Sequence, residues 1–91
     1  MDFAWDKAKS EHNFQTRGFG FDFAALIFSG LALEAQDDRQ DYGEIRIRAI
    51  GQAQGFVLAV VYTDRGDTRR IISARLANRK ERDLWHSFAK L

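Results

Sequence analysis

The stretch from residue 56 to residue 76 constrains the fold more than any other part of the chain. Residues 56–63 are almost all apolar, which is typical of a central strand covered on both faces. Residues 64–67 read Asp-Arg-Gly-Asp, and the glycine can adopt the positive φ that a tight hairpin turn requires. Residues 68–76 can form the partner strand. The sequence therefore predicts a β-hairpin inside an antiparallel sheet.

The second strand of this hairpin carries more positive charge than a strand with two buried faces can hold. Side chains alternate between the two faces of a strand. Strict alternation places four side chains on one face, namely Arg69, Ile71, Ser73 and Arg75. We expect one face of this strand to be apolar and the other to stay open for an anionic ligand.

Caps, breakers and apolar spacing predict the other elements. Asp6 and Gly18 bound a first helix, and Asn78 with Glu81 forms a capping box before the last helix. The full set in chain order is an edge strand (2–5), helix (7–17), helix (23–29), strand (31–35), acidic loop (36–42), strand (44–50), turn (51–55), hairpin (56–76) and a C-terminal helix.

This order predicts an α+β fold, with an antiparallel sheet of about four strands, two N-terminal helices and one C-terminal helix covering one sheet face. A chain of 91 residues with 45% hydrophobic and 30% charged residues suits one folded domain, residues 1–91. No apolar run reaches the length of a membrane span, and the N-terminus lacks an export signal. We therefore expect no membrane association and a cytoplasmic location.

The charge is unevenly distributed along the chain. The formal net charge is only +1, but residues 1–42 contain eight acidic and four basic side chains, whereas residues 43–91 contain five acidic and ten basic ones. Two interpretations stay open. The arginines of the second half are either solvated side chains on a mixed surface or part of a phosphate-binding face.

The phosphate-binding interpretation points to one kind of chemistry. If Arg46 and Arg75 lie on the same open face, they form a paired guanidinium site, with the Thr63 hydroxyl and the Glu44 carboxylate beside it. When an RNA 2′-hydroxyl attacks the adjacent phosphate, negative charge builds on the phosphorane oxygens, and arginines held in place stabilise that charge. The residues thus suit cleavage of RNA without a metal.

Such a reaction also needs a base for the 2′-hydroxyl and an acid for the leaving 5′-oxygen. Glu44, His12, Lys9 and His86 are candidates if the fold brings them together. The chain has only two histidines, no cysteine, and no spacing typical of a metal site. We expect neither a metal nor another cofactor.

Each candidate also has a structural alternative. Arg46 is either a site residue or one partner of a cross-strand ion pair with Glu44. His12 is either a proton-transfer group or a solvated helix residue. Trp85 is either a core residue or an aromatic ring that stacks on a base. Arg65, in the hairpin turn, either guides substrate or pairs with a neighbouring aspartate.

Several segments occur in a specific order along nearly the whole chain. They are Phe3-Ala4-Trp5-Asp6 with Lys9 and Asn13, Gly18-Phe19 with Asp22-Phe23, Glu44 and Arg46 before Ile50-Gly51, Thr63-Asp64-Arg65-Gly66-Asp67, Arg70-Ile71-Ile72-Ser73-Ala74-Arg75, and Glu81-Arg82. In this order the chain resembles the BrnT family of toxins from type II toxin–antitoxin pairs, small ribonucleases with a RelE-like fold.

The resemblance implies metal-independent cleavage of RNA and growth arrest by the free protein. It also implies neutralisation by a BrnA-like ribbon-helix-helix antitoxin in a heterotetramer, with operator DNA bound only through the antitoxin. The polar positions that match the family are Lys9, Glu44, Arg46, Thr63, Arg65, Arg75, Glu81 and Arg82.

This chain departs from the family pattern at two positions. Arg17 stands where the family usually has a histidine, and Trp85 stands where it usually has a tyrosine. An arginine cannot exchange a proton near neutral pH, so an alternative function is a catalytically attenuated homologue that acts as an antitoxin-binding corepressor. A third interpretation is a nucleic-acid binder without a partner. The predicted catalytic residues are Arg75, Arg46, Glu44, Lys9, His12 and Trp85, and the predicted substrate-binding residues are Arg65, Thr63, Arg69 and Arg17.

Overall fold

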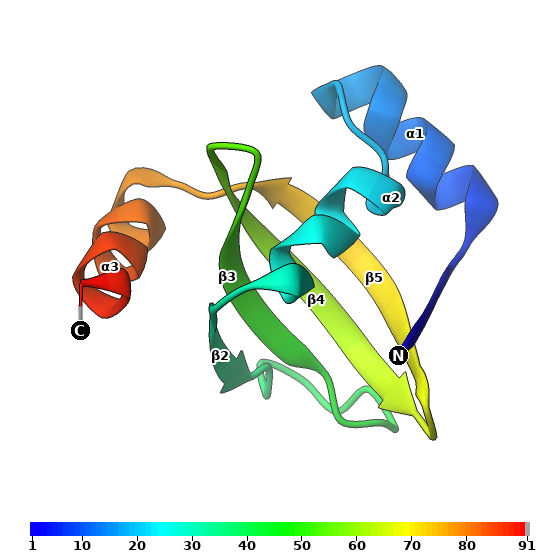
Figure 1. The fold of residues 1–91 in the computed structure, drawn as a ribbon. Coiled ribbons are helices and arrows are strands. Elements are labelled where there is room, and N and C mark those ends of the chain that lie inside the picture. The colour runs from blue at the N-terminus through cyan, green and yellow to red at the C-terminus, as the bar shows by residue number, and fades with distance from the viewer. Residues whose placement is uncertain (91) are drawn as a thin grey trace.

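The computed structural model describes residues 1–90 of the chain. Within them lie two α-helices and one shorter helical segment in two parts, and a five-stranded sheet (Figure 1). The elements are β1 (Asp2–Trp5), α1 (Lys7–Arg17), α2 (Phe21–Ala24), the 3₁₀ helix η1 (Ala25–Ser29), β2 (Ala32–Gln36), β3 (Ile47–Ala53), β4 (Phe56–Arg65), β5 (Thr68–Leu76) and α3 (Arg79–Ala89).

The α+β class is confirmed, but the predicted antiparallel sheet of about four strands is matched only in part. The sheet has five strands in the order β1-β5-β4-β3-β2, and β1 runs parallel to β5. The other neighbouring pairs are antiparallel. Alternation in residues 2–5 predicted an edge strand, but it carries no information on the direction of a partner more than sixty residues away. The sheet is therefore mixed.

A β-bulge in β5 changes which of its side chains share a face. Val61 of β4 pairs with Ser73, but Tyr62 pairs with Ile71, so Ile72 is an extra residue in β5. An extra residue reverses the alternation beyond it. Arg69 consequently lies on the same face as the buried Ile71, opposite to the face of Ser73. The prediction that Arg69, Ile71, Ser73 and Arg75 share one face is wrong.

One face of the sheet is covered by α2 and η1. Phe21, Ala24 and Ile27 from this helical segment are buried together with strand residues such as Leu58 and Val60. The helical segment approaches β3 closely at Gly51, where an added Cβ would lie 2.8 Å from the Cβ of Ile27. The absence of a side chain at this position allows direct contact between helix and strand.

The opposite face is covered by α3 at one end only, so the prediction that all helices cover one face is wrong. Trp85 of α3 packs with Val57 and Ala77, and with the half-buried Leu33 and Ile50. Figure 1 shows α3 apart from the other helices, beside the end of the sheet. The middle of this face, around Ala59 and Val61 of β4, is left without a helix above it.

The boundaries of α1 are confirmed. The Asp6 side chain accepts a hydrogen bond from the backbone N–H of Lys9, and Gly18 ends the helix with a φ of 87°. The second helix begins earlier than predicted, at Phe21, and narrows to a 3₁₀ helix from Ala25.

The strand predicted at 44–50 lies later in the chain. It begins at Ile47 and runs to Ala53. The strand continues as far as Ala53 because the turn to β4 consists only of Gln54 and Gly55, both at positive φ. The prediction of a turn over 51–55 is wrong in its first three residues. Glu44 and Arg46 therefore precede the strand instead of belonging to it.

A four-arginine pocket as the candidate functional site

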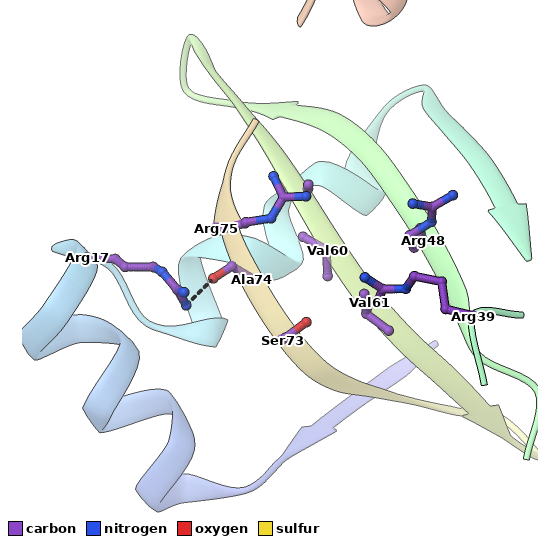
Figure 2. A pocket seen from close by; sticks show the side chains of 9 residues that line it. Arg17, Arg39, Arg48, Val60, Val61, Ser73, Ala74 and Arg75 are labelled. Carbon is purple, nitrogen blue, oxygen red and sulfur yellow. Dashed lines mark hydrogen bonds between the residues drawn. The ribbon is translucent and has the colours of Figure 1, made fainter. Parts of the chain in front are cut away.

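The uncovered part of the sheet forms a pocket of about 210 Å³ that is surrounded by arginine side chains. Ala59, Val60 and Val61 of β4 line its centre. Figure 2 shows Arg39 and Arg48 to one side of Val61, with Ser73, Arg75 and Arg17 to the other.

Strand register explains why these side chains meet. Val61 is paired with Arg48 of β3 on one side and with Ser73 of β5 on the other, and Ala59 is paired with Arg75. Paired residues of neighbouring strands lie on the same face, about 5 Å apart. The bulge at Ile72 is necessary for this arrangement, because it sets the register that pairs Ser73 with Val61.

Arg75 is held in place by Glu81 in the first turn of α3. Its two terminal nitrogens donate to Oε1 and Oε2 of Glu81 at 2.7 and 2.9 Å. The Glu81 hydrogen bond raises the pKa of Arg75, and Arg75 in turn lowers the pKa of Glu81. Oε1 of Glu81 also accepts the backbone N–H of Asn78 in the capping box. The side chain of Arg75 is 46% exposed, so its guanidinium is both fixed and accessible.

Arg17 is fixed from the end of α1. Its Nη1 atom donates to Oδ1 of Asn13 at 2.8 Å. The same atom donates to the carbonyl oxygen of Ala74 at 3.2 Å (Figure 2). Asn13 is itself buried, 3% exposed, and donates to the carbonyl oxygen of Phe19. Asn13 therefore links the guanidinium of Arg17 to the backbone of the segment between α1 and α2.

Arg39 and Arg48 were absent from the predicted site residues. Arg48 was detectable in principle, because it follows the alternation of β3 and faces the same way as Ile50. Arg39 had no such signal, since it belongs to the acidic loop between β2 and β3. The side chain of Asp37 accepts both Nε and Nη2 of Arg39, at 2.7 and 2.8 Å.

The pocket is strongly cationic. Of the charged side chains that line it, all four are arginines, and Ser73 supplies a hydroxyl. A site of this kind binds phosphate or carboxylate groups through several N–H donors at once. The pocket offers no side chain that can accept a proton near neutral pH, because arginine stays charged.

A second, shallower depression adjoins the pocket, and Arg17 and Ser73 line both. Lys9 and His12 of α1 lie in this depression, together with Asp6 and Asn13. Two of the predicted catalytic residues are thus next to the arginine pocket. An extended ligand that lies across Ser73 would contact both the arginine pocket and the adjoining depression.

Glu44 and Arg46 do not line the pocket, and the predicted pairing of Arg46 with Arg75 is not found. Glu44 accepts hydrogen bonds from Arg46 at 3.3 Å and from Arg65 at 3.1 Å. These bonds, that from Arg65 above all, lower the pKa of Glu44. The guanidinium carbon of Arg46 lies 4.1 Å from the centre of the Tyr42 ring. This group forms an ion-pair cluster just before β3. Arg46 pairs with Glu44 within its own segment and not across strands, and Arg65 pairs with Glu44 instead of the neighbouring aspartate that was expected.

Three more predicted residues make structural contacts within the fold, namely Thr63, Arg69 and Trp85. Thr63 is 3% exposed and donates to the carbonyl oxygen of Ile45 at 2.7 Å. Arg69 forms a bidentate pair with Asp64 and lies over the rings of Phe28 and Tyr62.

Trp85 is 5% exposed in the cluster beneath α3. Its burial agrees with the core alternative and leaves no free ring face for a base.

Within residues 1–90, no three His, Cys, Asp or Glu side chains lie close enough together to hold a metal ion. Across the same residues, no helix is long and apolar enough to cross a membrane.

A mixed five-stranded sheet with helices on both faces, and an arginine pocket on the uncovered part of one face, defines a small α+β protein with an anion-binding site. Residues 5–81 match the family model described as ribonuclease toxin, BrnT, of type II toxin–antitoxin systems. Because the match covers most of the sequence, the chain belongs to this family of ribonuclease toxins. A toxin of a type II system has an antitoxin as its partner. No curated protein gives a significant match to the sequence.

Proposed function

We propose that the protein is an endoribonuclease that cleaves RNA at the four-arginine pocket. The observation that carries this proposal is the gathering of Arg17, Arg39, Arg48 and Arg75 around the exposed surface of β4. Four guanidinium groups on one small surface repel one another, and a bound anion offsets this repulsion. In a ribonuclease toxin, the anion that fits is the RNA phosphodiester.

The proposed reaction is attack of a ribose 2′-oxygen on the adjacent phosphorus. The bond between phosphorus and the 2′-oxygen forms as the bond to the 5′-oxygen breaks, leaving a 2′,3′-cyclic phosphate and a 5′-hydroxyl. Arg75 donates to the non-bridging oxygens, whose negative charge grows in the phosphorane. Arg75 suits this role because Glu81 fixes its orientation before substrate arrives.

Proton transfer is assigned in this proposal to the depression next to the pocket. Imidazole is the side chain that most often transfers protons near neutral pH, and His12 lies in the depression with Lys9. Ser73 and Arg17 connect it to the arginine pocket. We infer that His12 serves the 2′-hydroxyl or the leaving 5′-oxygen, and that Lys9 binds a flanking phosphate. The mechanism routes no step through a metal or another cofactor.

The test is cleavage of a short synthetic RNA by the purified protein. We expect Arg75→Ala to lower the cleavage rate by roughly a hundredfold to a thousandfold, as for loss of a transition-state donor. Arg79→Ala is a matched control, because Arg79 is an exposed arginine of α3 outside the pocket. A substrate with 2′-deoxyribose at the cleaved position should resist the wild-type protein. Equal rates for the two variants would refute the assignment of the site.

An attenuated toxin that acts as a corepressor with its antitoxin is the second candidate. One observation favours it: none of the side chains that line the arginine pocket itself can exchange a proton near neutral pH. Expression without antitoxin separates the two candidates. Growth arrest with RNA cleavage supports the ribonuclease, whereas normal growth with intact RNA supports the attenuated form.

The proposal includes neutralisation by a BrnA-like ribbon-helix-helix antitoxin in a heterotetramer, with operator DNA contacted only through the antitoxin. The RelE-like architecture is part of the same proposal. Its support is the family membership of the chain. Copurification with the protein from an adjacent small reading frame, followed by measurement of the mass of the complex, tests the partner and its stoichiometry.

A further inference from the structure

Arg39 differs from the other arginines of the pocket in what holds it there. Arg48 and Arg75 extend from strands, and Arg17 lies at the end of a helix. Arg39 belongs to the connection between β2 and β3, and its side chain is 65% exposed. An exposed arginine on a loop has many rotamers open to it, so its presence at the pocket requires a specific partner.

That partner is Asp37, whose carboxylate is buried. Asp37 is 3% exposed. Its two oxygens accept the Nε and Nη2 atoms of Arg39 at 2.7 and 2.8 Å, and Tyr42 donates its hydroxyl to Oδ2 at 3.3 Å. The Arg39 hydrogen bond lowers the pKa of Asp37 to about 2. The backbone N–H of Asp37 donates to the carbonyl oxygen of Arg46 at 2.7 Å, which fixes the carboxylate relative to β3.

Electrostatic repulsion makes such a partner necessary. Arg39 lines the pocket with three other arginines, and its charge disfavours the protonated form of Arg75. Without a counter-charge, the exposed guanidinium of Arg39 would turn away into solvent. Asp37 does not line the pocket. It therefore orients Arg39 without placing a carboxylate against a bound phosphate.

We propose that Asp37 is a positioning residue that holds Arg39 at the pocket, and that Arg39 with Arg48 binds a second phosphate of the same RNA strand. This inference rests on the proposed function. Arg39 and Arg48 lie across β4 from Arg75 and Arg17 (Figure 2). The backbones of β3 and β5, which carry Arg48 and Arg75, are two strand spacings apart, about 10 Å, and we therefore assign the two sides to two phosphates.

The test measures binding of a non-cleavable 2′-O-methyl oligoribonucleotide at several salt concentrations. Each phosphate contact to a single strand adds about 0.7 to the slope of log affinity against log salt concentration. We expect Arg39→Ala and Asp37→Asn each to weaken binding and to reduce this slope by about 0.7. In cleavage assays both should raise KM more than they lower kcat.

Asp41→Asn is the matched control, since it removes the same charge from the same loop. Asp41 is exposed, and its side chain accepts only the backbone N–H of Gly43 among the hydrogen bonds of the described residues. Affinity, salt slope and KM of this variant should equal those of the wild type. Thermal unfolding of every variant identifies any loss of folding, and the largely exposed Arg39 can be truncated without opening the core.

A double variant tests whether Asp37 acts through Arg39. If it does, the double variant Asp37→Asn/Arg39→Ala should bind the oligoribonucleotide no more weakly than Arg39→Ala alone. The inference is overturned if Asp37→Asn matches Asp41→Asn, or if its effect adds in full to that of Arg39→Ala. If Arg75→Ala abolishes cleavage while Arg39→Ala changes neither slope nor KM, this inference falls and the proposed function stands. If the wild-type protein neither binds nor cleaves RNA, both fall.

Discussion

At the scale of single residues, the protein fixes three of the four pocket arginines by pairing them with buried or half-buried groups. Glu81 holds Arg75, Asn13 holds Arg17, and Asp37 holds Arg39. Preorganisation of this kind lowers the entropy lost when a ligand binds. The supporting residues are therefore as informative about the site as the arginines themselves.

Glu81→Gln tests this pairing. Glutamine keeps the shape of the side chain and one acceptor oxygen, but it loses the negative charge that orients Arg75. We expect RNA cleavage to fall by about tenfold, which corresponds to about 1.4 kcal/mol of transition-state stabilisation. Asp83→Asn, a similar loss of charge on the same helix outside the pocket, is the control. An unchanged rate for Glu81→Gln would show that Arg75 needs no fixed orientation.

The lowered pKa of the Asp37 carboxylate also predicts how stability depends on pH. Its folded-state pKa of about 2 lies below the ordinary value of 3.8. Its ionised form is therefore favoured by folding, so this contribution to stability is complete above the ordinary pKa and is lost as pH falls towards 2. Urea unfolding should show Asp37→Asn to be less stable than wild type at pH 7, with the difference shrinking below pH 4. A constant difference down to pH 2 would contradict the pairing.

At the scale of elements, the close contact between η1 and β3 predicts a sensitive glycine. Gly51→Ala places a Cβ against the Cβ of Ile27, in a part of the core where neither backbone can move freely. We expect a loss of about 1–3 kcal/mol in the free energy of unfolding. Gly30→Ala is the control, because an added Cβ there meets no atom within 4 Å. Equal stability of the two variants would show that the helix shifts without cost.

At the scale of the whole molecule, two apolar cores share one sheet, and the smaller core sets the position of Arg75. Trp85 anchors α3 on the sheet, and α3 carries Glu81. We expect Trp85→Phe to retain RNA cleavage within about threefold, because a smaller ring still anchors the helix. Trp85→Ala should cost about 3–5 kcal/mol of stability. Complete loss of cleavage by a stably folded Trp85→Phe protein would instead indicate direct contact with RNA.

The local features of the sequence predicted much of this structure. Asp6 and Gly18 predicted the two ends of α1 correctly. The strand predicted at 68–76 is β5, and the capping box of Asn78 and Glu81 predicted the start of α3. These signals depend on neighbours in the chain, which a sequence displays directly. The alternation of its own strand also led to the hypothesis that Arg75 lies on an open face.

The remaining features depend on contacts between distant segments. A single extra residue at Ile72 has no signature in composition, yet it moved Arg69 to the covered face. The partner of β1 is set by packing across the whole chain. Arg39 lines the pocket from a loop, in which its partner is Asp37, two residues before it. Charge alone did not distinguish Arg46, which is bound to Glu44, from Arg48, which faces the pocket.

The contact between Arg17 and the Ala74 carbonyl has a consequence for self-association. β1 pairs with β5 only from Thr68 to Ile71, so the later part of β5 is an edge of the sheet. Exposed strand edges recruit strands from other molecules, and the guanidinium of Arg17 occupies an acceptor on this edge. Variants of Arg17 should therefore be examined for oligomers and turbidity before any loss of activity is assigned to chemistry.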